Sequence, residues 1–589
     1  MQRREFIHLM GLATAAGLVP GTVFSGNASQ HDLYDVPMQG DLRLLHFTDC
    51  HGQLNPVYFR EPHVNLGIGA DLGRPPHLVG DKLLSHYGIS KGSLEAHAFT
   101  HLDFSEAARR YGKVGGFAHM ATLINQLRAQ AGRENTLLLD GGDTWQGSGL
   151  SLKTKGLDMV GACNKLGVDV MTGHWEYTFW EKDIRANLEA FNGEFVANNV
   201  RAKEEAMFEG AQVHDEDSGH VFKPYVMRTL GQHRVAVIGQ SFPYTPVANP
   251  GYFIPDWTFG IQDESLQALV NTLRETEKPD AVVLLSHNGM DVDLKMASRV
   301  SGIDVIFGGH THDGVPTPVA VKNATGQTLV TNAGSNGKFV ASMDLKIKNH
   351  KVVGYHYRLL PVFSRLLRPD ADMADYIKKT RAPYEKWLQE PLGASEELLY
   401  RRGNFMGSFD QLTCDSLREV LGADIAFSPG FRWGTSILPG QSITREHVLD
   451  QTATNYSHTY IRQMEGQEIK VVLEDVADNL FHTDPYLRQG GDMVRVGGLY
   501  YQIDPSQVMG KRISNMTLAA TGEKIQAKKC YSVAGWAGVH SVGAGAPVWE
   551  VIEDYLLAVG VVKNQVLHTP SVSGVKGNPG IQGYRGELL

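Results

Sequence analysis

Seven carboxylate and imidazole side chains stand in five short motifs between residues 47 and 314, and their types suit metal binding. Two carboxylates and five imidazoles are about what two divalent cations need when one carboxylate bridges them and positions stay open for hydroxide and substrate. Mixed oxygen and nitrogen donors suit manganese, iron or zinc and do not decide among them. The motifs are FTDCHGQ with Asp49 and His51, LDGGDTWQG with Asp143, GHWE with His174, SHNGMD with His287, and GGHTHDG with His310 and His312.

Each motif by itself has a structural alternative. An Asp-x-His pair occurs often by chance, and a single histidine after a strand is commonly a hydrogen-bonded structural residue. GGHTHDG is more specific, because His310 and His312 flank one residue on a Gly-rich strand end and project to the same side. All five motifs in this order, each at the end of a strand, predict one shared metal site.

Apolar runs and amphipathic stretches must position these motifs. The runs lack polar alternation, which is typical of strands covered on both faces. Helical patterns lie between several of them, at 116–131, 181–191 and 265–277. Together they predict a layered α/β domain with functional side chains past the carboxyl ends of its strands. The predicted strands cover 43–49, 136–143, 168–174, 195–199, 234–240, 281–288 and 304–312.

The remaining segments suggest a second domain. Residues 53–114 are rich in Gly, Pro and His without periodicity, which predicts a long loop that is either functional or disordered. A strand hairpin is expected at 328–362, and 370–390 predicts one exposed linker helix with charges on one face. The predicted parts are an export signal at 1–30, a catalytic domain at 41–365, a linker at 366–394 and a second domain at 395–589. Within the second domain we expect helices at 408–422 and 466–480, a strand at 499–504 and a tail that runs over the surface.

The amino terminus, MQRREFIHLMGLATAAGLVPGTVFSGNASQ, pairs Arg3 and Arg4 before a short, weakly apolar stretch. This pattern is typical of a twin-arginine export signal with cleavage near Ala28, and the alternative is an amphipathic surface helix. The stretch is too short and polar for a stable membrane span, and we find no later segment of spanning length. We therefore expect a soluble mature protein, exported folded to the periplasm.

Charge and cysteine content exclude some functions. A net charge of −9 without any dense basic stretch favours neither nucleic acid nor a membrane as partner. The cysteines Cys50, Cys163, Cys414 and Cys530 show no CxxC pairing, so we expect most to be small buried residues. Cys50 differs because it lies between two candidate ligands, and the sequence leaves its role open.

The order D-x-H, GGD, GNHE, H, GHTH resembles that of the binuclear metallophosphoesterase superfamily, with GHWE here in place of GNHE. The second domain resembles the carboxyl-terminal domain of 5′-nucleotidases at YIRQMEGQEIKVVLE and FSPGFRWG. HFTDCHGQLNPVYFREP, GGDTWQGSG, GHWEYTFW and FSPGFRWG look like the SoxB family of periplasmic thiosulfohydrolases, over nearly the full mature chain. The resemblance implies a four-layered α/β metallophosphoesterase domain of mixed sheets flanked by helices, followed by a 5′-nucleotidase-type α/β domain.

The resemblance also implies a ligand set and a substrate. Asp49, His51, Asp143 and His312 would bind one metal, and Asp143 would bridge to a second held by His174, His287 and His310. Manganese is implied by the family alone, with zinc or iron as alternatives. The implied substrate is thiosulfate attached to a cysteine on the flexible arm of a SoxYZ carrier, from which sulfate is released. We expect a monomer.

Four further residues are candidates for substrate binding or catalysis. Arg432 in FSPGFRWG matches the arginine with which nucleotidases bind substrate anions, and its planar fork suits a sulfonate. Arg201 and Arg60 are weaker candidates, because a lone arginine is more often a solvated surface residue. Trp175 replaces a histidine that could protonate a leaving group, and an indole cannot shuttle protons at neutral pH. A sulfur leaving group needs little such help, so we interpret Trp175 as a sign of sulfur chemistry; packing beneath a ligand is the alternative.

Two other functions remain open at this point. A periplasmic 5′-nucleotidase would stack a base between aromatics, for which Tyr500 and Tyr501 could serve unless they only pack in a strand. A non-catalytic metal-dependent binding protein is less favoured, because binding alone does not need two metals. For a carrier arm we expect a narrow channel between the domains, formed partly by residues 53–114.

Overall fold

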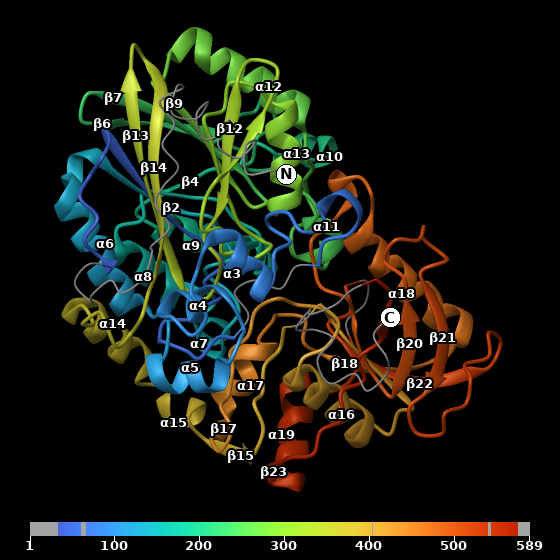
Figure 1. Cartoon of the computed structure of the whole chain (residues 1–589). Helices are drawn as coiled ribbons and strands as arrows, with labels where there is room; N and C mark the ends of the chain where they lie inside the picture. Colours follow the sequence, from blue (N-terminus) through green and yellow to red (C-terminus); the bar gives the residue numbers. More distant parts are fainter. Residues whose placement is uncertain (1–32, 61–65, 403, 540–542, 575–589) are drawn as a thin grey trace.

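The computed structural model describes residues 33–60, 66–402, 404–539 and 543–574 (Figure 1). The predicted export signal at 1–30 lies outside these ranges, as do residues 575–589 of the expected tail. None of the helices within the described ranges combines the length and the apolar character needed to cross a bilayer.

Two six-stranded mixed sheets form the first domain, in the orders β14-β13-β1-β2-β3-β4 and β11-β12-β10-β9-β7-β6. Strands β1 to β4 run parallel, as do β12, β10, β9 and β7, and antiparallel strands complete the edges. The strands are β1 (Leu42–Phe47), β2 (Thr136–Asp140), β3 (Val170–Met171), β4 (Glu194–Phe195), β6 (Tyr225–Leu230), β7 (His233–Gln240), β9 (Ala281–Ser286), β10 (Val305–Gly308), β11 (Val319–Lys322), β12 (Gln327–Asn332), β13 (Phe339–Lys348) and β14 (Lys351–Pro361); the short strands β5 (Arg201–Ala202) and β8 (Trp257–Thr258) pair separately.

Helices cover the outer faces of both sheets, so the first domain has four layers. Along β9, Val283 and Leu285 join the core shared with β1 and β2, whereas Val282 and Leu284 face α12 and α13, as the twofold strand periodicity requires. Figure 1 shows α6 and α8 flanking one sheet and α12 and α13 near the other. The predicted fold class is confirmed. These helices are α6 (Phe117–Ala131), α8 (Leu157–Leu166), α9 (Glu181–Ala190), α12 (Asp263–Thr272) and α13 (Met290–Arg299).

The second part of the chain builds three small sheets around α16 to α19, and Figure 1 shows it beside the first domain. Helix α16 packs against α19 and against β16, which pairs with β22 in the four-stranded sheet β18-β22-β16-β19. Its elements are β15 (Pro391–Ser395), α16 (Ser408–Leu421), β16 (Ile425–Ser428), β17 (Ser442–Thr444), α17 (Arg445–Thr452), β18 (Thr459–Glu465), α18 (Gly466–Phe481), β19 (Arg495–Gly497), β20 (Leu499–Ile503), β21 (Ile513–Leu518), β22 (Cys530–Trp536), α19 (Val548–Val559), β23 (Val561–Val562) and β24 (Ser571–Val572).

Two local predictions need correction. The single linker helix is in fact two, α14 (Ala371–Arg381) and α15 (Glu385–Leu388), because Pro383 cannot donate a helical hydrogen bond. The segment 53–114 is not one irregular loop, since it contains α3 (Asp81–Tyr87), α4 (Leu94–Phe99) and α5 (Phe104–Tyr111). Helices of six to eight residues complete about two turns, too few to show a clear hydrophobic period.

Candidate metal centre

The structure brings all seven predicted ligands together at the carboxyl ends of five strands. Strands β1, β2, β3, β9 and β10 each end just before one of the motifs. The donor atoms form two groups that share Asp143, and within each group they lie within 4.8 Å of one another. One group is Asp143, His174, His287 and His310; the other is Asp49, His51, Asp143 and His312.

The backbone at this site is strained. Asp49, His51, Asp143, His310 and His312 all adopt positive φ, between 48° and 68°. A non-glycine residue pays a steric penalty in that left-handed region, and such residues persist only where the surrounding structure holds them. Turning the chain this sharply directs several side chains from different strand ends toward one point.

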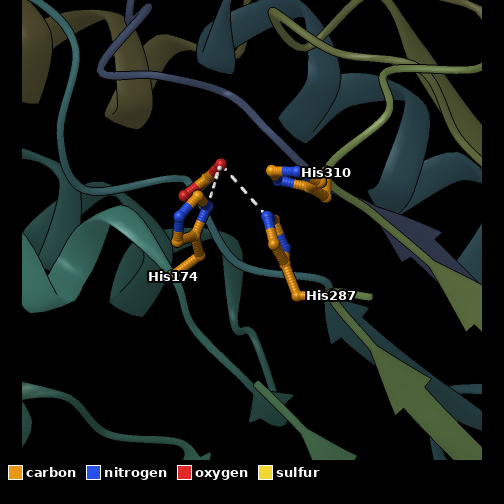
Figure 2. Close-up of side chains that lie close together, drawn as sticks. His174, His287 and His310 are labelled. Carbon is orange, nitrogen blue, oxygen red and sulfur yellow. Dashed lines mark hydrogen bonds and ion pairs between the residues drawn. The ribbon is translucent and has the colours of Figure 1, made fainter. Parts of the chain in front are cut away.

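Three histidines, His174, His287 and His310, lie close together in Figure 2, and Asp143 belongs to both donor groups. Its Oδ2 is 3.2 Å from His174 Nδ1 and 3.0 Å from His287 Nε2. In the other group, His312 Nε2 is 3.1 Å from Asp49 Oδ1 and 3.0 Å from His51 Nε2. Ring nitrogens and carboxylate oxygens thus converge on two neighbouring points, as a pair of cations bridged by Asp143 requires.

The charges of these groups also fit a cation pair. Burial lowers the pKa of His51 to about 4 and the pKa values of His310 and His312 well below their usual range, so these imidazoles are neutral and offer lone pairs. Burial opposes the charged form of His287, yet Asp143 and Asp49 outweigh it and raise its pKa to about 10. The two carboxylates therefore hold a positive charge between them, which metal ions would supply in place of the proton.

Hydrogen bonds from outside the cluster orient the ligands. His287 Nδ1 donates to the Gly141 carbonyl at 2.6 Å, which leaves Nε2 facing the site. Thr48 Oγ1 donates to Asp49 Oδ2 at 2.6 Å. The Trp175 amide donates to Asp143 Oδ1 at 2.6 Å, leaving Oδ2 for the centre. Such partners fix which ligand atom points at a metal.

Glu176 joins two of the ligand loops, a role that sequence reasoning missed. Its buried carboxylate accepts four backbone hydrogen bonds, at Oε2 from Asp143 (3.2 Å) and His174 (2.9 Å) and at Oε1 from Thr144 (2.8 Å) and Trp145 (3.1 Å). Because the four amides belong to the loops after β2 and β3, one carboxylate sets the position of both. Its position in the sequence, two residues after the candidate ligand His174, could have suggested this role.

Arg432 lies beside the cluster, and its charge lowers the pKa values of His310 and His312. Its Nη2 donates to the Gly491 carbonyl at 2.8 Å and its Nε is 3.3 Å from Asp492, while its buried Nη1 has no hydrogen-bond partner among the described residues. Burial lowers the pKa of Arg432 to about 10, so it stays charged at neutral pH. A charged guanidinium with unused N–H donors next to these candidate metal ligands suits an anionic substrate.

Sequence reasoning also missed Arg402 and Asp492. Arg402 is buried, its Nε is 3.4 Å from Asp492, and its charge too lowers the pKa of His312. Asp492 also contacts Arg495, at 2.9 Å, and so anchors three arginines from separate segments. No local pattern marks this cluster, because its members meet only through folding.

Trp175 lies in an aromatic cluster that joins the two domains. Its ring centroid is 5.0 Å from that of Phe431, 4.7 Å from that of Trp433 and 6.0 Å from that of Tyr456. Trp433 in turn stacks on the candidate ligand His51 at 5.7 Å. The indole is therefore packed, as the alternative interpretation expects, and the cluster to which it belongs also forms a wall beside the ligands.

The other two arginine candidates have different surroundings. Arg201 donates to the Ser218 carbonyl at 2.7 Å and to Ser265 at 3.1 Å, at the start of the short strand β5. Arg60 is buried, with its guanidinium 4.0 Å above the Tyr400 ring. Neither residue lines the pocket beside the metal cluster.

That pocket lies between the domains, is partly open to solvent, and has a cavity volume of about 40 Å³. Its lining includes Thr311, which is next to His310, and Arg432. His77 also lines it, and this residue belongs to the segment 53–114 that was expected to form part of a channel. Tyr500 and Tyr501 do not line it; Tyr501 is buried in the strand core, as the packing alternative for this pair expects.

Cys50, Cys163 and Cys414 are buried and free, whereas Cys530 is exposed.

Known proteins resemble this chain over most of its length. The model of the family "5′-nucleotidase, C-terminal domain" matches residues 396–551. The solved structure of the sulfate thiohydrolase SoxB from Thermus thermophilus is 36% identical, with a TM-score of 0.86, and the match covers 92% of this chain and 98% of that one. The 5′-nucleotidase of Bos taurus is 25% identical over 80% of this chain and 83% of its own length. The trifunctional nucleotide phosphoesterase YfkN of Bacillus subtilis is 25% identical over 77% of this chain, which spans only 32% of that longer protein.

Proposed function

The chain belongs to the SoxB family of the 5′-nucleotidase and binuclear metallophosphoesterase superfamily, and from this premise we propose that it is a thiosulfohydrolase acting on a carrier protein. The substrate would be a thiosulfate joined to a cysteine of a SoxYZ-type carrier, and the product sulfate. The proposal rests on the chain being a hydrolase of this superfamily with residue groups able to hold metal ions. The observation that carries the proposed activity on sulfur is the indole of Trp175, directly after a candidate ligand, where nucleotidases have a histidine that can act as an acid.

Two divalent ions, for which we propose manganese with zinc or iron as alternatives, would supply a nucleophilic hydroxide at neutral pH and positive charge opposite the sulfonate oxygens. The chain's part is to hold the donors in place before the substrate arrives. The bonds from Gly141, Thr48 and the Trp175 amide do this for His287, Asp49 and Asp143.

Arg432 would bind the sulfonate. Its buried Nη1 has no hydrogen-bond partner among the described residues, and together with the second N–H of Nη2 it offers parallel donors to two oxygens of the tetrahedral sulfonate. Asp492 keeps the guanidinium oriented without neutralising the site, because Arg402 and Arg495 share that carboxylate. Burial and the charges of Arg402 and Arg432 lower the pKa of His312, so positive charge lies next to the candidate ligands, as an anionic substrate requires.

The bond changes favour sulfur over phosphate esters. An S–O bond forms between hydroxide and the sulfonate sulfur, and the S–S bond breaks with its electron pair leaving on the carrier's sulfur. The carrier keeps a persulfide anion, and the attacking water gives up two protons, one when the hydroxide forms and one when the product ionises to sulfate. A persulfide is a weak base and leaves without an acid, whereas a sugar alkoxide benefits from protonation, which Trp175 cannot provide.

Export to the periplasm by the twin-arginine pathway is part of the proposal, and its support is the Arg3–Arg4 pair ahead of a short, weakly apolar stretch. This pathway carries folded proteins, so an enzyme could acquire its metals before export. The carrier would meet the enzyme there through its cysteine-bearing arm, which would enter the pocket between the domains.

The test compares a carrier whose cysteine bears a thiosulfate with AMP, using the purified metal-loaded protein. We expect sulfate release from the carrier to exceed phosphate release from AMP by at least about 100-fold in kcat/KM, because general-acid assistance is worth about 10²–10⁴ to an alkoxide leaving group. Asp143→Asn should abolish both. Equal or better turnover of AMP would overturn the proposal in favour of a 5′-nucleotidase.

A further inference from the structure

A segment of the second domain, residues 484–492, crosses onto the first domain and ends at the metal cluster. Asp484 pairs with Lys295 at 2.5 Å, and the Tyr486 hydroxyl donates to Asp263 at 3.2 Å. Arg488 pairs with Asp291 of the first domain at 2.9 Å. These contacts dock residues 484–492, hereafter the crossing segment, on the catalytic domain.

Beyond these contacts the crossing segment touches a candidate metal ligand. The Gln489 carbonyl accepts a hydrogen bond from His310 Nε2 at 2.8 Å. A carbonyl carries no proton, so Nε2 must hold the ring hydrogen, which leaves Nδ1 of His310 as the atom available to a metal. Among the hydrogen bonds of the described residues, His310 is thus the one ligand in its group whose tautomer is set by a residue of the other domain.

Gly490 makes this contact possible. Its φ is +75°, and a Cβ on this residue would lie 2.9 Å from His310 Cδ2 and 3.0 Å from His310 Nε2. A side chain would therefore be strained in its backbone and would push the imidazole. The next residue, Gly491, has no such restriction, because its Cβ would meet only the Gly430 carbonyl, at 4.0 Å.

The same segment also contacts the anion-binding side. The Gly491 carbonyl accepts from Arg432 Nη2 at 2.8 Å, and Asp492 lies 3.3 Å from Arg432 Nε. Four consecutive residues therefore connect a ligand of one domain with the arginine of the other. Any shift of the crossing segment would move the partners of both groups.

We infer that the Gln489 carbonyl, with Gly490 beside it, is a positioning element for the second metal ion. It fixes the tautomer and the ring orientation of His310, so that affinity at the site of Asp143, His174, His287 and His310 depends on docking of the second domain. The inference rests on the proposed two-metal centre. Outer partners of ligating histidines raise ligand basicity, and losing one typically costs about 10–100-fold in metal affinity.

The experiment measures Mn²⁺ binding to the metal-free full chain by titration calorimetry. We expect two sites in the wild type and, in Gly490→Ala, about 10-fold or greater loss of affinity at one site with the other unchanged. Gly491→Ala and Gln489→Ala are the matched controls, since the first adds a Cβ in open space and the second keeps the carbonyl; both should bind two ions as the wild type does.

Loss of fold is separated from loss of positioning by the melting temperature of each metal-free variant and by a second substitution. Arg488→Gln loosens the crossing segment without adding an atom near His310, and should weaken the same site. If Gly490→Ala and Arg488→Gln both bind Mn²⁺ at both sites with wild-type affinity, the inference is overturned but the two-metal centre is not. A wild type that binds fewer than two ions would overturn the two-metal centre and the inference with it.

Discussion

Replacing Glu176 by glutamine tests how the metal-ligand loops are held. The carboxylate accepts backbone hydrogen bonds from Asp143 and His174 on Oε2 and from Thr144 and Trp145 on Oε1, at 2.8–3.2 Å. Glutamine has nearly the same shape, but one of its two terminal atoms is an NH₂ group. Two of the four amides would then face a donor instead of an acceptor.

The cost follows from that count. Leaving two buried amides unsatisfied costs about 1–3 kcal/mol each, so about 2–6 kcal/mol in all, before the lost charge on the remaining two bonds is considered. Burial and the nearby Asp143 raise the pKa of Glu176, while the amides of His174 and Trp145 act against that shift. The four amide donors require the charged form of Glu176, because a protonated carboxyl would present one donor just as glutamine does.

The assay is urea unfolding of the metal-free protein together with Mn²⁺ affinity. We expect Glu176→Gln to unfold at lower urea concentration and to bind the metal at least about 10-fold more weakly, since it displaces the partners of two ligands. Glu181→Gln is the control: that residue pairs with Arg185 on the surface of α9, and its loss should cost under about 0.5 kcal/mol. Wild-type stability and affinity in Glu176→Gln would refute the reasoning.

Four further substitutions or treatments have defined outcomes. Arg432→Lys keeps the charge but loses the planar fork, so kcat/KM on the carrier with cysteine-bound thiosulfate should fall about 10- to 100-fold, the value of one charge-assisted bond. Arg201→Lys should stay within about twofold, and equal losses in the two variants would contradict the assignment of Arg432 to the site. Trp175→His should raise phosphate monoester hydrolysis, measured with AMP, and a large gain in S–S cleavage instead would contradict the leaving-group argument. Burial and Glu446 raise the pKa of Asp450 to about 7, above the unfolded value of about 3.9. The folded state therefore binds more protons than the unfolded state between about pH 4 and 7, and the free energy of unfolding falls as pH rises through that range. Asp450→Asn should have a higher melting temperature than the wild type at pH 8 and the same melting temperature at pH 4. Equal melting temperatures at pH 8 would contradict this. A chelator should lower the melting temperature and Mn²⁺ should restore it, whereas the same treatment of Asp143→Ala should change little; an unshifted wild type would argue against bound metal.

The sequence was sufficient to select the residues that meet at the metal cluster. Asp49, Asp143 and His287 stand directly after apolar runs that predict buried strands. Asp49 and Asp143 follow the parallel neighbours β1 and β2 of one sheet, and His287 follows β9 of the other. Arg201 also follows such a run, yet it contacts Ser218 and Ser265. The position after a strand therefore predicts a shared site well when several candidate ligands show it, and poorly when a single residue does.

Elements were predictable where a pattern repeats often enough to be seen. The helix α6 over 15 residues matches its pattern, whereas α3, α4 and α5 were hidden in a segment that looked irregular. The break between α14 and α15 could have been predicted, because Pro383 is present in the sequence. The difference is one of length, since short helices depend on tertiary packing for their stability.

The sequence by itself determined the chemistry available to this protein: which strand ends carry imidazoles and carboxylates, and that an indole stands where a proton donor is expected. The tertiary structure alone decided which atom of each ligand faces the centre. Glu176 orients two loops at once, Asp492 gathers three arginines, and the Gln489 carbonyl sets the tautomer of His310 from 179 residues away in the chain. Local patterns reflect burial and dihedral preference, whereas these contacts join segments that only tertiary packing brings together. They lie within one domain for Glu176 and Asp492 and across the two domains for Gln489.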